Sequence, residues 1–72
     1  LSLPRTGRVT VEVVGLDGRR VATLRDARLD AGVHPVRWDG TDQRGRSTAS
    51  GLYFVRAVFE GRAVMLRFAR LR

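Results

Sequence analysis

The sequence predicts an all-β protein, a small antiparallel β-sandwich of about seven strands. Apolar and polar residues alternate with a period of two along most of the chain, as they do in half-buried strands. Turn residues such as Asp17-Gly18, Asp39-Gly40 and Glu60-Gly61 divide this pattern at short intervals. No segment carries the apolar stripe of an amphipathic helix.

The first two strands are expected before residue 15. Leu1 to Pro4 can form a short strand that ends at Pro4, because proline has no N–H to donate to a ladder. In the second strand Val9, Val11 and Val13 share one face, and polar residues take the other.

A hairpin is predicted next. Asp17-Gly18 is a strong turn signal because both residues tolerate positive φ. The returning strand, residues 19–24, is expected to bury Val21. Leu24 is one residue out of phase with Val21, which predicts a β-bulge or the strand end at that point.

The middle of the chain combines a charged loop, residues 25–30, with a further strand. In this strand His34, Val36 and Trp38 share one face. Pro35 lies on the opposite face and indicates that part of the strand is at a sheet edge or beside a bulge.

Two strands joined by the tight turn Glu60-Gly61 complete the pattern, one over residues 52–59 and one from Arg62 to Arg72. The predicted core combines the inward positions of all strands: Val9, Val11, Val13, Val21, Leu29, Val36, Trp38, Tyr53, Val55, Ala57, Val64, Leu66 and Phe68.

Size and composition limit the function. Seventy-two residues make one domain, and the absence of cysteine excludes disulfides, cysteine-ligated zinc and thiol catalysis. No apolar run approaches the roughly 20 residues that span a bilayer as a helix, and these 72 residues contain no signal-peptide pattern, as expected for the tail of a larger protein. The net charge of +7 comes from fourteen arginines and seven acids. The arginines are dispersed, which favours solvated strand faces over a nucleic-acid site.

Trp38 and the loop after it are the first candidate site. The indole can act as an exposed carbohydrate platform or, as its phase with Val36 favours, lie in the core near Val11, Val21 and Val55.

Asp39 and Asp42 can be considered as calcium ligands, but calcium needs six to eight oxygens. We expect these carboxylates to accept loop N–H bonds instead, with glycines at the positive-φ positions of a structural loop. The residues of that loop are Asp39, Gly40, Asp42, Gly45 and Gly51.

Catalysis is not expected. His34 is the single imidazole, and no serine, threonine or acid stands near it in a triad-like motif. Zinc-binding, phosphate-binding and dinucleotide-binding motifs are absent from the sequence. The sequence therefore predicts a non-enzyme with no cofactor and no metal.

Three segments together resemble the Ig-like modules at the C-termini of bacterial secreted proteins. They run from Leu16 to Leu24, from Leu29 to Val36, and through Trp38-Asp39-Gly40 to Ser50-Gly51-Leu52-Tyr53. These modules are the FlgD-type Ig-like domains and the C-terminal sorting domains of type IX secretion. The resemblance implies an Ig-like sandwich with Trp38 and Tyr53 in its core, the Tyr53 hydroxyl bonding to backbone a few residues upstream.

The resemblance also implies a function and a location. Residues 1–72 are expected to be a single Ig-like C-terminal domain of a larger exported protein, extracellular or at the cell surface, used for sorting, surface attachment or structural capping. Its partners would be the secretion machinery, an upstream passenger domain or neighbouring subunits, and not a specific nucleic acid. The residues expected to contact a partner are Arg67, Arg70 and Arg72 at the basic end and Asp17, Gly18 and Arg19 in the first hairpin turn.

An alternative of another class is an assembly module that polymerises or docks through its sheet edges, as a homo-oligomer, a filament or a hook-cap-like scaffold. Leu52, Phe54 and Val58 favour it, because they form an apolar stripe opposite the core face of their strand. Exposed apolar stripes and unpaired edges are typical of protein-binding surfaces.

Overall fold

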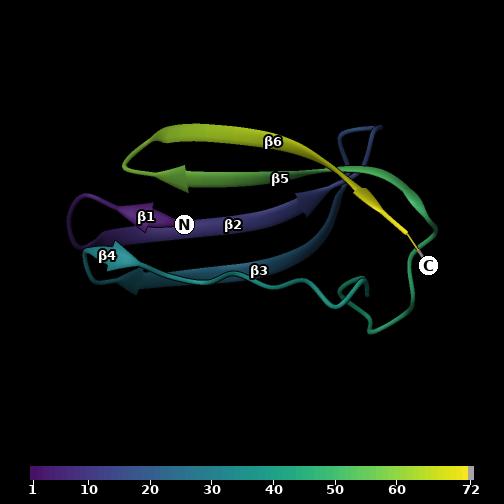
Figure 1. The fold of residues 1–72 in the computed structure, drawn as a ribbon, viewed down its shortest axis with the longest axis horizontal. Helices are drawn as coiled ribbons and strands as arrows, with labels where there is room; N and C mark the ends of the chain where they lie inside the picture. Colours follow the sequence, from purple (N-terminus) through teal and green to yellow (C-terminus); the bar gives the residue numbers. More distant parts are fainter. Residues whose placement is uncertain (72) are drawn as a thin grey trace.

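A computed structural model describes residues 1–71, and each regular element in this range is a β-strand (Figure 1). The strands are β1 (Ser2–Leu3), β2 (Gly7–Val14), β3 (Arg20–Leu29), β4 (Gly32–Val33), β5 (Gly51–Phe59) and β6 (Arg62–Arg70). The all-β, antiparallel prediction is confirmed for this part of the chain. None of the described residues forms a helix that could cross a membrane.

Residues 1–71 form six strands in two sheets, fewer than the expected seven. The larger sheet has four strands in the order β3-β2-β5-β6, and the smaller sheet pairs β1 with β4. Since β1 and β4 have two residues each, the smaller sheet covers only part of the larger one. A complete two-layer sandwich is therefore not confirmed.

The strand predicted through His34, Val36 and Trp38 differs most from expectation. Only Gly32–Val33 forms β4, and residues 34–39 lie outside any strand. These three side chains are nevertheless half-buried while the residues between them are exposed, so the predicted alternation is real. Pro35 lacks the N–H that a continuous ladder needs.

β3 is bulged at two places along its pairing with β2. Thr23 pairs with Glu12 and Arg25 with Val11, which leaves Leu24 as the extra residue and confirms the predicted bulge. After the Leu24 bulge Ala22 lies opposite Val13, and a second register shift before the Arg20–Val14 pair leaves Val21 as the extra residue. Ala22 is therefore buried and Val21 only half-buried, so the prediction of Val21 as the buried residue of this strand is wrong.

The core lies on one face of the larger sheet, which we call the inner face. Leu3, Val9 and Val11 form a buried cluster there, and Val36 and Val55 pack against it. The prediction that Val64 and Leu66 are core residues is wrong, because they are 61% and 64% exposed. β1 and β4 are too short to reach across the inner face to β6.

Both predicted hairpin turns are present. In the first, Gly18 has φ of 84° and the Asp17 carboxylate accepts the Arg19 N–H at 3.0 Å. In the second, Glu60 and Gly61 have φ of 52° and 76°, and they join Phe59 to its partner Arg62. Two positive φ angles in a two-residue loop are typical of a type I′ turn, whose twist matches that of the strands.

Candidate protein-binding surface

The edge strand β6 is the most exposed apolar strand of the larger sheet in the described chain. It pairs with β5 in an unbroken register from Arg62–Phe59 to Arg70–Gly51, and residues 1–71 place no strand on its other side. Val64, Met65 and Leu66 are 61%, 51% and 64% exposed. An exposed edge of this kind can accept a strand from another chain.

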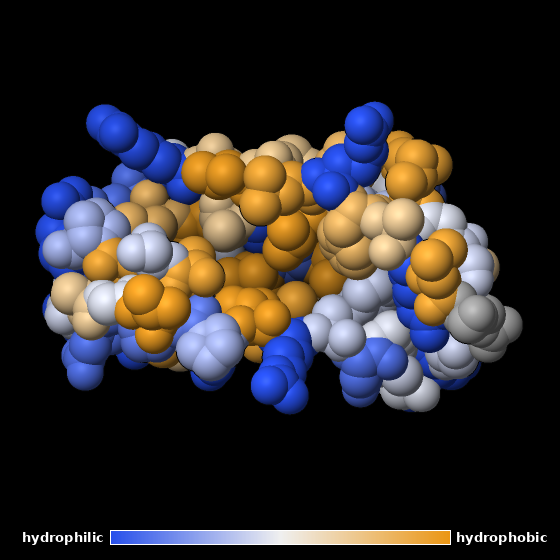
Figure 2. All heavy atoms as spheres, in the orientation of Figure 1, coloured by the Kyte–Doolittle hydropathy of each residue, from blue (hydrophilic) through white to orange (hydrophobic). Residues whose placement is uncertain are grey.

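A groove of about 820 Å³ lies beside β6 on the inner face. Leu1 and Leu3 line one wall, and Val64 and Leu66 line the other. Figure 2 shows the apolar hollow from the same side as Figure 1. Monomeric proteins rarely leave a large apolar surface open without a use for it.

Arg5 and Glu60 stand at the rim of this groove. The Arg5 guanidinium donates to the Glu60 carboxylate, and this hydrogen bond is the first cause that lowers the pKa of Glu60. The same bond raises the pKa of Arg5. Glu60 is therefore already engaged, while Arg62 beside it is exposed.

The predicted assembly stripe lies on the opposite, outer face of β5. Leu52 is exposed, whereas Phe54 and Val58 are half-buried. Phe54 is flanked by Val14 on one side and Arg67 on the other. Since β5 is an interior strand, the stripe offers side chains but no open backbone edge, and its role in assembly stays a prediction.

Three aromatic rings close the end of the inner face opposite the β5–β6 turn. The Trp38 ring centroid lies 5.2 Å from that of Tyr53 and 5.6 Å from that of Phe68, both in edge-on geometry. The Trp38 indole N–H donates to the Thr41 carbonyl at 2.9 Å. The Tyr53 hydroxyl donates to the Ala49 carbonyl, four residues upstream, at 2.6 Å, as its sequence context predicts. Trp38 is half-buried, with its contacts made inside the domain.

Arg70 is part of this cluster. Its guanidinium lies 5.8 Å from the centre of the Trp38 ring, a cation–π distance. It also fills the space where a side chain at Gly40 would collide with it. Arg67, by contrast, is exposed. The structure therefore separates these two of the three arginines predicted at the basic end; Arg72 lies outside the described residues.

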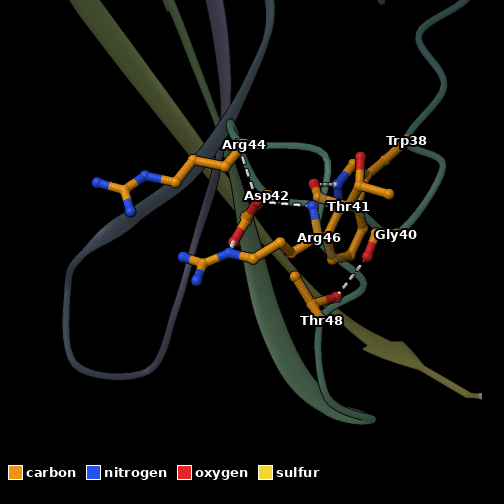
Figure 3. A network of polar contacts seen from close by, with 7 residues as sticks. All are labelled: Trp38, Gly40, Thr41, Asp42, Arg44, Arg46 and Thr48. Atoms are coloured by element: carbon orange, nitrogen blue, oxygen red, sulfur yellow. Dashed lines mark hydrogen bonds and ion pairs between the residues drawn. The ribbon is translucent and has the colours of Figure 1, made fainter.

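Two aspartates brace the loop from Asp39 to Thr48, and Figure 3 shows the contacts of Asp42. The Asp42 carboxylate accepts the N–H groups of Arg44 at 2.8 Å and Arg46 at 3.0 Å, and pairs with the Arg46 side chain at 3.2 Å. The Asp39 carboxylate accepts both the N–H and the hydroxyl of Thr41. These contacts are the structural role expected from the sequence.

The same contacts lower the pKa of both aspartates. The backbone hydrogen bond from Arg46 is the first cause for Asp42, and the Thr41 hydroxyl is the first cause for Asp39. Gly40, Gly45 and Gly51 have φ of 84°, 78° and 153°, as the loop interpretation requires. Among residues 1–71, no three acidic or histidine side chains are grouped as metal ligands would be.

His34 is tied into the backbone of the domain. Its ring Nε2–H donates to the Asp30 carbonyl at 2.6 Å, and its own N–H donates to the Leu1 carbonyl at 2.7 Å. The imidazole is thus hydrogen-bonded within the domain, although residue 34 lies outside any strand.

The first-hairpin residues predicted to meet a partner are exposed at the β2–β3 turn. Asp17 shapes this turn through its bond to the Arg19 N–H, and Gly18 supplies the positive φ. A role for Asp17, Gly18 and Arg19 in binding stays a prediction.

Sequence reasoning did not select the β6 edge. Val64 and Leu66 were assigned to the core from their alternation, and Met65 was not singled out. Alternation shows that a strand has two faces, but it does not show which strand ends the sheet. The two-residue hairpin at Glu60-Gly61 predicts that β6 pairs with β5, but it does not show whether another strand lies beyond β6.

Comparisons with known proteins identify relatives. The family model for the FlgD Ig-like domain matches residues 4–61. Two curated proteins, each named Basal-body rod modification protein FlgD, are similar: one from Salmonella typhimurium and one from Salmonella typhi. Each is 41% identical over 46 residues, or 64% of this chain. The match spans 20% of each relative's own length. No solved structure matches the chain with comparable significance.

Proposed function

The chain belongs to the family of FlgD Ig-like domains, and from this premise we propose that it is a non-catalytic assembly module of a larger exported protein. It acts outside the cell or at the cell surface, as part of a flagellar hook-cap or similar scaffold. The observation that carries the proposal is the open edge of β6, with Val64, Met65 and Leu66 exposed beside an apolar groove. Edge strands and apolar grooves bind other polypeptides.

The side-chain chemistry supports a binding role over catalysis. The histidine and the two loop aspartates that could serve catalysis or metal binding are engaged in local backbone hydrogen bonds. The relatives carry the name of a basal-body rod modification protein, which favours a role in building a structure of that kind.

Deleting residues 1–72 from the polypeptide that carries them tests this function. Export is measured by immunoblotting the culture medium, and assembly by electron microscopy of the surface structure. We expect export to continue while assembly fails, because the module supplies contacts between subunits. A control replaces the module with an unrelated Ig-like domain of similar size. Normal assembly in the deletion would contradict the proposal.

A second candidate is sorting and surface attachment, favoured by exposed residues in and just after the last part of β6. Arg67 is exposed, and Leu71 is 87% exposed just after β6. A reporter fused to the domain would lose export when Ala69 to Arg72 are deleted. The matched control is R37Q/R44Q, which removes two positive charges from exposed side chains away from the end of β6. Export that survives the deletion would remove the sorting role and leave the assembly role standing.

A further inference from the structure

We infer that β6 binds an extended segment of an acidic partner, in which apolar residues alternate with aspartate or glutamate, as an added strand of the larger sheet. The inference rests on the proposed assembly function and names the partner's chemistry. It joins three observations: a regular free edge, an apolar groove beside it, and exposed arginines along it.

The backbone of β6 is correctly oriented for strand addition. Phe59 and Arg62 flank a two-residue turn, so they form a pair that exchanges both backbone hydrogen bonds. Antiparallel ladders alternate, so every second residue from Arg62 onward bonds to β5. The N–H and C=O groups of the residues between them are directed to the open edge: Ala63, Met65, Arg67 and Ala69.

The inner face determines where the partner's apolar residues fall. Val64 and Leu66 point to the groove, and residues directly opposite each other on neighbouring strands point to the same face. A residue opposite Val64 or Leu66 would therefore lie at the groove and cover these exposed side chains. The residues between them would face outwards.

The outer face determines where the partner's acidic residues fall. Arg56 lies opposite Met65, and Arg67 follows two residues later on the same face of β6. Both arginines are exposed. A carboxylate opposite Met65 or Arg67 would thus lie within reach of a guanidinium. At the groove end Arg62 is also exposed, and the hydrogen bonds of the neighbouring Glu60 carboxylate go to Arg5.

Charge argues against a second copy of this chain as the occupant. An antiparallel pairing of two β6 strands centred on Leu66 would place Arg62 of each chain opposite Arg70 of the other. Like charges directly opposite destabilise a sheet, and each chain carries a net charge of +7. The arginines thus deter self-pairing and favour an acidic strand.

The test uses two peptides that have the same composition but a different order of residues, and two variants that differ in the residue at position 65. The first peptide alternates valine and glutamate over nine residues, and the second carries the same residues as one glutamate block and one valine block. Both are capped, so they have equal charge. The variant Met65→Pro removes an N–H that faces the open edge, and Met65→Thr keeps it. Circular dichroism first shows that both variants are folded.

Binding is measured by calorimetry, and the bound edge by hydrogen exchange of the amides of Met65 and Arg67. We expect the alternating peptide to bind the unmodified chain and the Met65→Thr variant with equal affinity. In both proteins it should slow hydrogen exchange at the amides of residues 65 and 67. Met65→Pro should bind it about tenfold more weakly, which corresponds to about 1.4 kcal/mol. The block peptide should also bind about tenfold more weakly than the alternating one.

Three results would overturn the inference. Equal binding of the two peptides would show attraction by charge alone, and unchanged binding by a folded Met65→Pro would move the site elsewhere. A dimer in sedimentation that Met65→Pro abolishes would make a second copy the occupant. If Met65→Pro does not fold, the charge variant Arg67→Glu decides, since it should prefer a lysine–valine peptide. None of these results bears on the deletion experiment, so the assembly function is judged separately.

Discussion

Along β3, which forms one edge of the larger sheet, two bulges interrupt the ladder to β2, whereas β6 at the other edge keeps an unbroken register with β5. The two edges also differ in cover. The Gln43 N–H donates to the Val21 carbonyl at 3.1 Å, and the Arg25 guanidinium donates to the Pro35 carbonyl at 3.3 Å. The segment after β4 therefore runs beside β3, as Figure 1 shows, and no described segment does this for β6.

The β3 edge is therefore protected against pairing with another strand, and the β6 edge is available for it. Bulges, charges and a covering segment are the usual means by which proteins prevent edge-to-edge pairing. β3 combines all three, with charged residues at Arg25, Asp26 and Arg28. β6 has only its arginines, which select among partners by charge instead of blocking the backbone.

The largest expected effect is the difference in stability loss between alanine substitutions of one leucine at each edge. Leu24 on β3 packs against the core, so Leu24→Ala should lower the free energy of unfolding by about 2 kcal/mol. Leu66 on β6 is mostly exposed, so Leu66→Ala should cost less than about 0.5 kcal/mol. Urea unfolding of both variants measures the difference. Equal losses would mean that β6 is covered as well as β3, and the comparison would fail.

Acid should weaken the contact between β3 and the loop that runs beside it, in which the Gln43 N–H donates to the Val21 carbonyl. The pKa of Asp42 and that of Asp39 are lowered from the ordinary value of 3.8. Carboxylates with a lowered pKa in the folded state contribute stability above 3.8, and this contribution is lost as the pH falls through the lowered pKa. Below about pH 4, the protection of the Gln43 amide against hydrogen exchange, measured relative to its intrinsic exchange rate at each pH, should therefore fall.

The variant Asp42→Asn is the control for this acid effect. Asparagine keeps an oxygen that accepts the loop N–H groups but does not titrate. Its loop should already be weaker at pH 7, because the ion pair with Arg46 is gone, and should depend less on pH. An acid dependence as steep as that of the unmodified chain would show that other groups control the loop.

The smallest effect is expected from a surface ion pair beside the β3 edge. Arg8 Nη2 lies 2.5 Å from Asp26 Oδ1, but the side chains are 67% and 54% exposed. Exposed pairs contribute little, so Arg8→Gln should change the free energy of unfolding by less than about 0.5 kcal/mol. Urea unfolding at low and high salt measures it. A loss comparable to that of Leu24→Ala would mean that charge, and not packing, stabilises this edge.

Much of the local structure was predictable from short-range rules. The Asp17-Gly18 and Glu60-Gly61 turns, the Leu24 bulge and the bracing by Asp39 and Asp42 each depend on residues close in sequence. The second bulge at Val21 was missed, because the apolar Val21 and Ala22 fit either face equally well and only pairing with Val13 decides between them.

The candidate site was predictable only in part. An edge role was expected, but it was attached to Leu52, Phe54 and Val58, which the fold places on an interior strand. Arg70 was expected at an exposed basic end, yet it lies on the Trp38 ring. Both differences come from strand order and from contacts between distant residues, which a period-two pattern does not encode.

By itself the sequence determined that this chain is an antiparallel β protein with hydrogen-bonded turns and no catalytic motif, because alternation and turn chemistry act over a few residues. Only the tertiary structure decided that β6 ends the sheet and that Val64 and Leu66 remain exposed. The physical reason is that burial depends on what covers a face. Here β1 and β4 are too short to cover the part of the inner face that β6 provides.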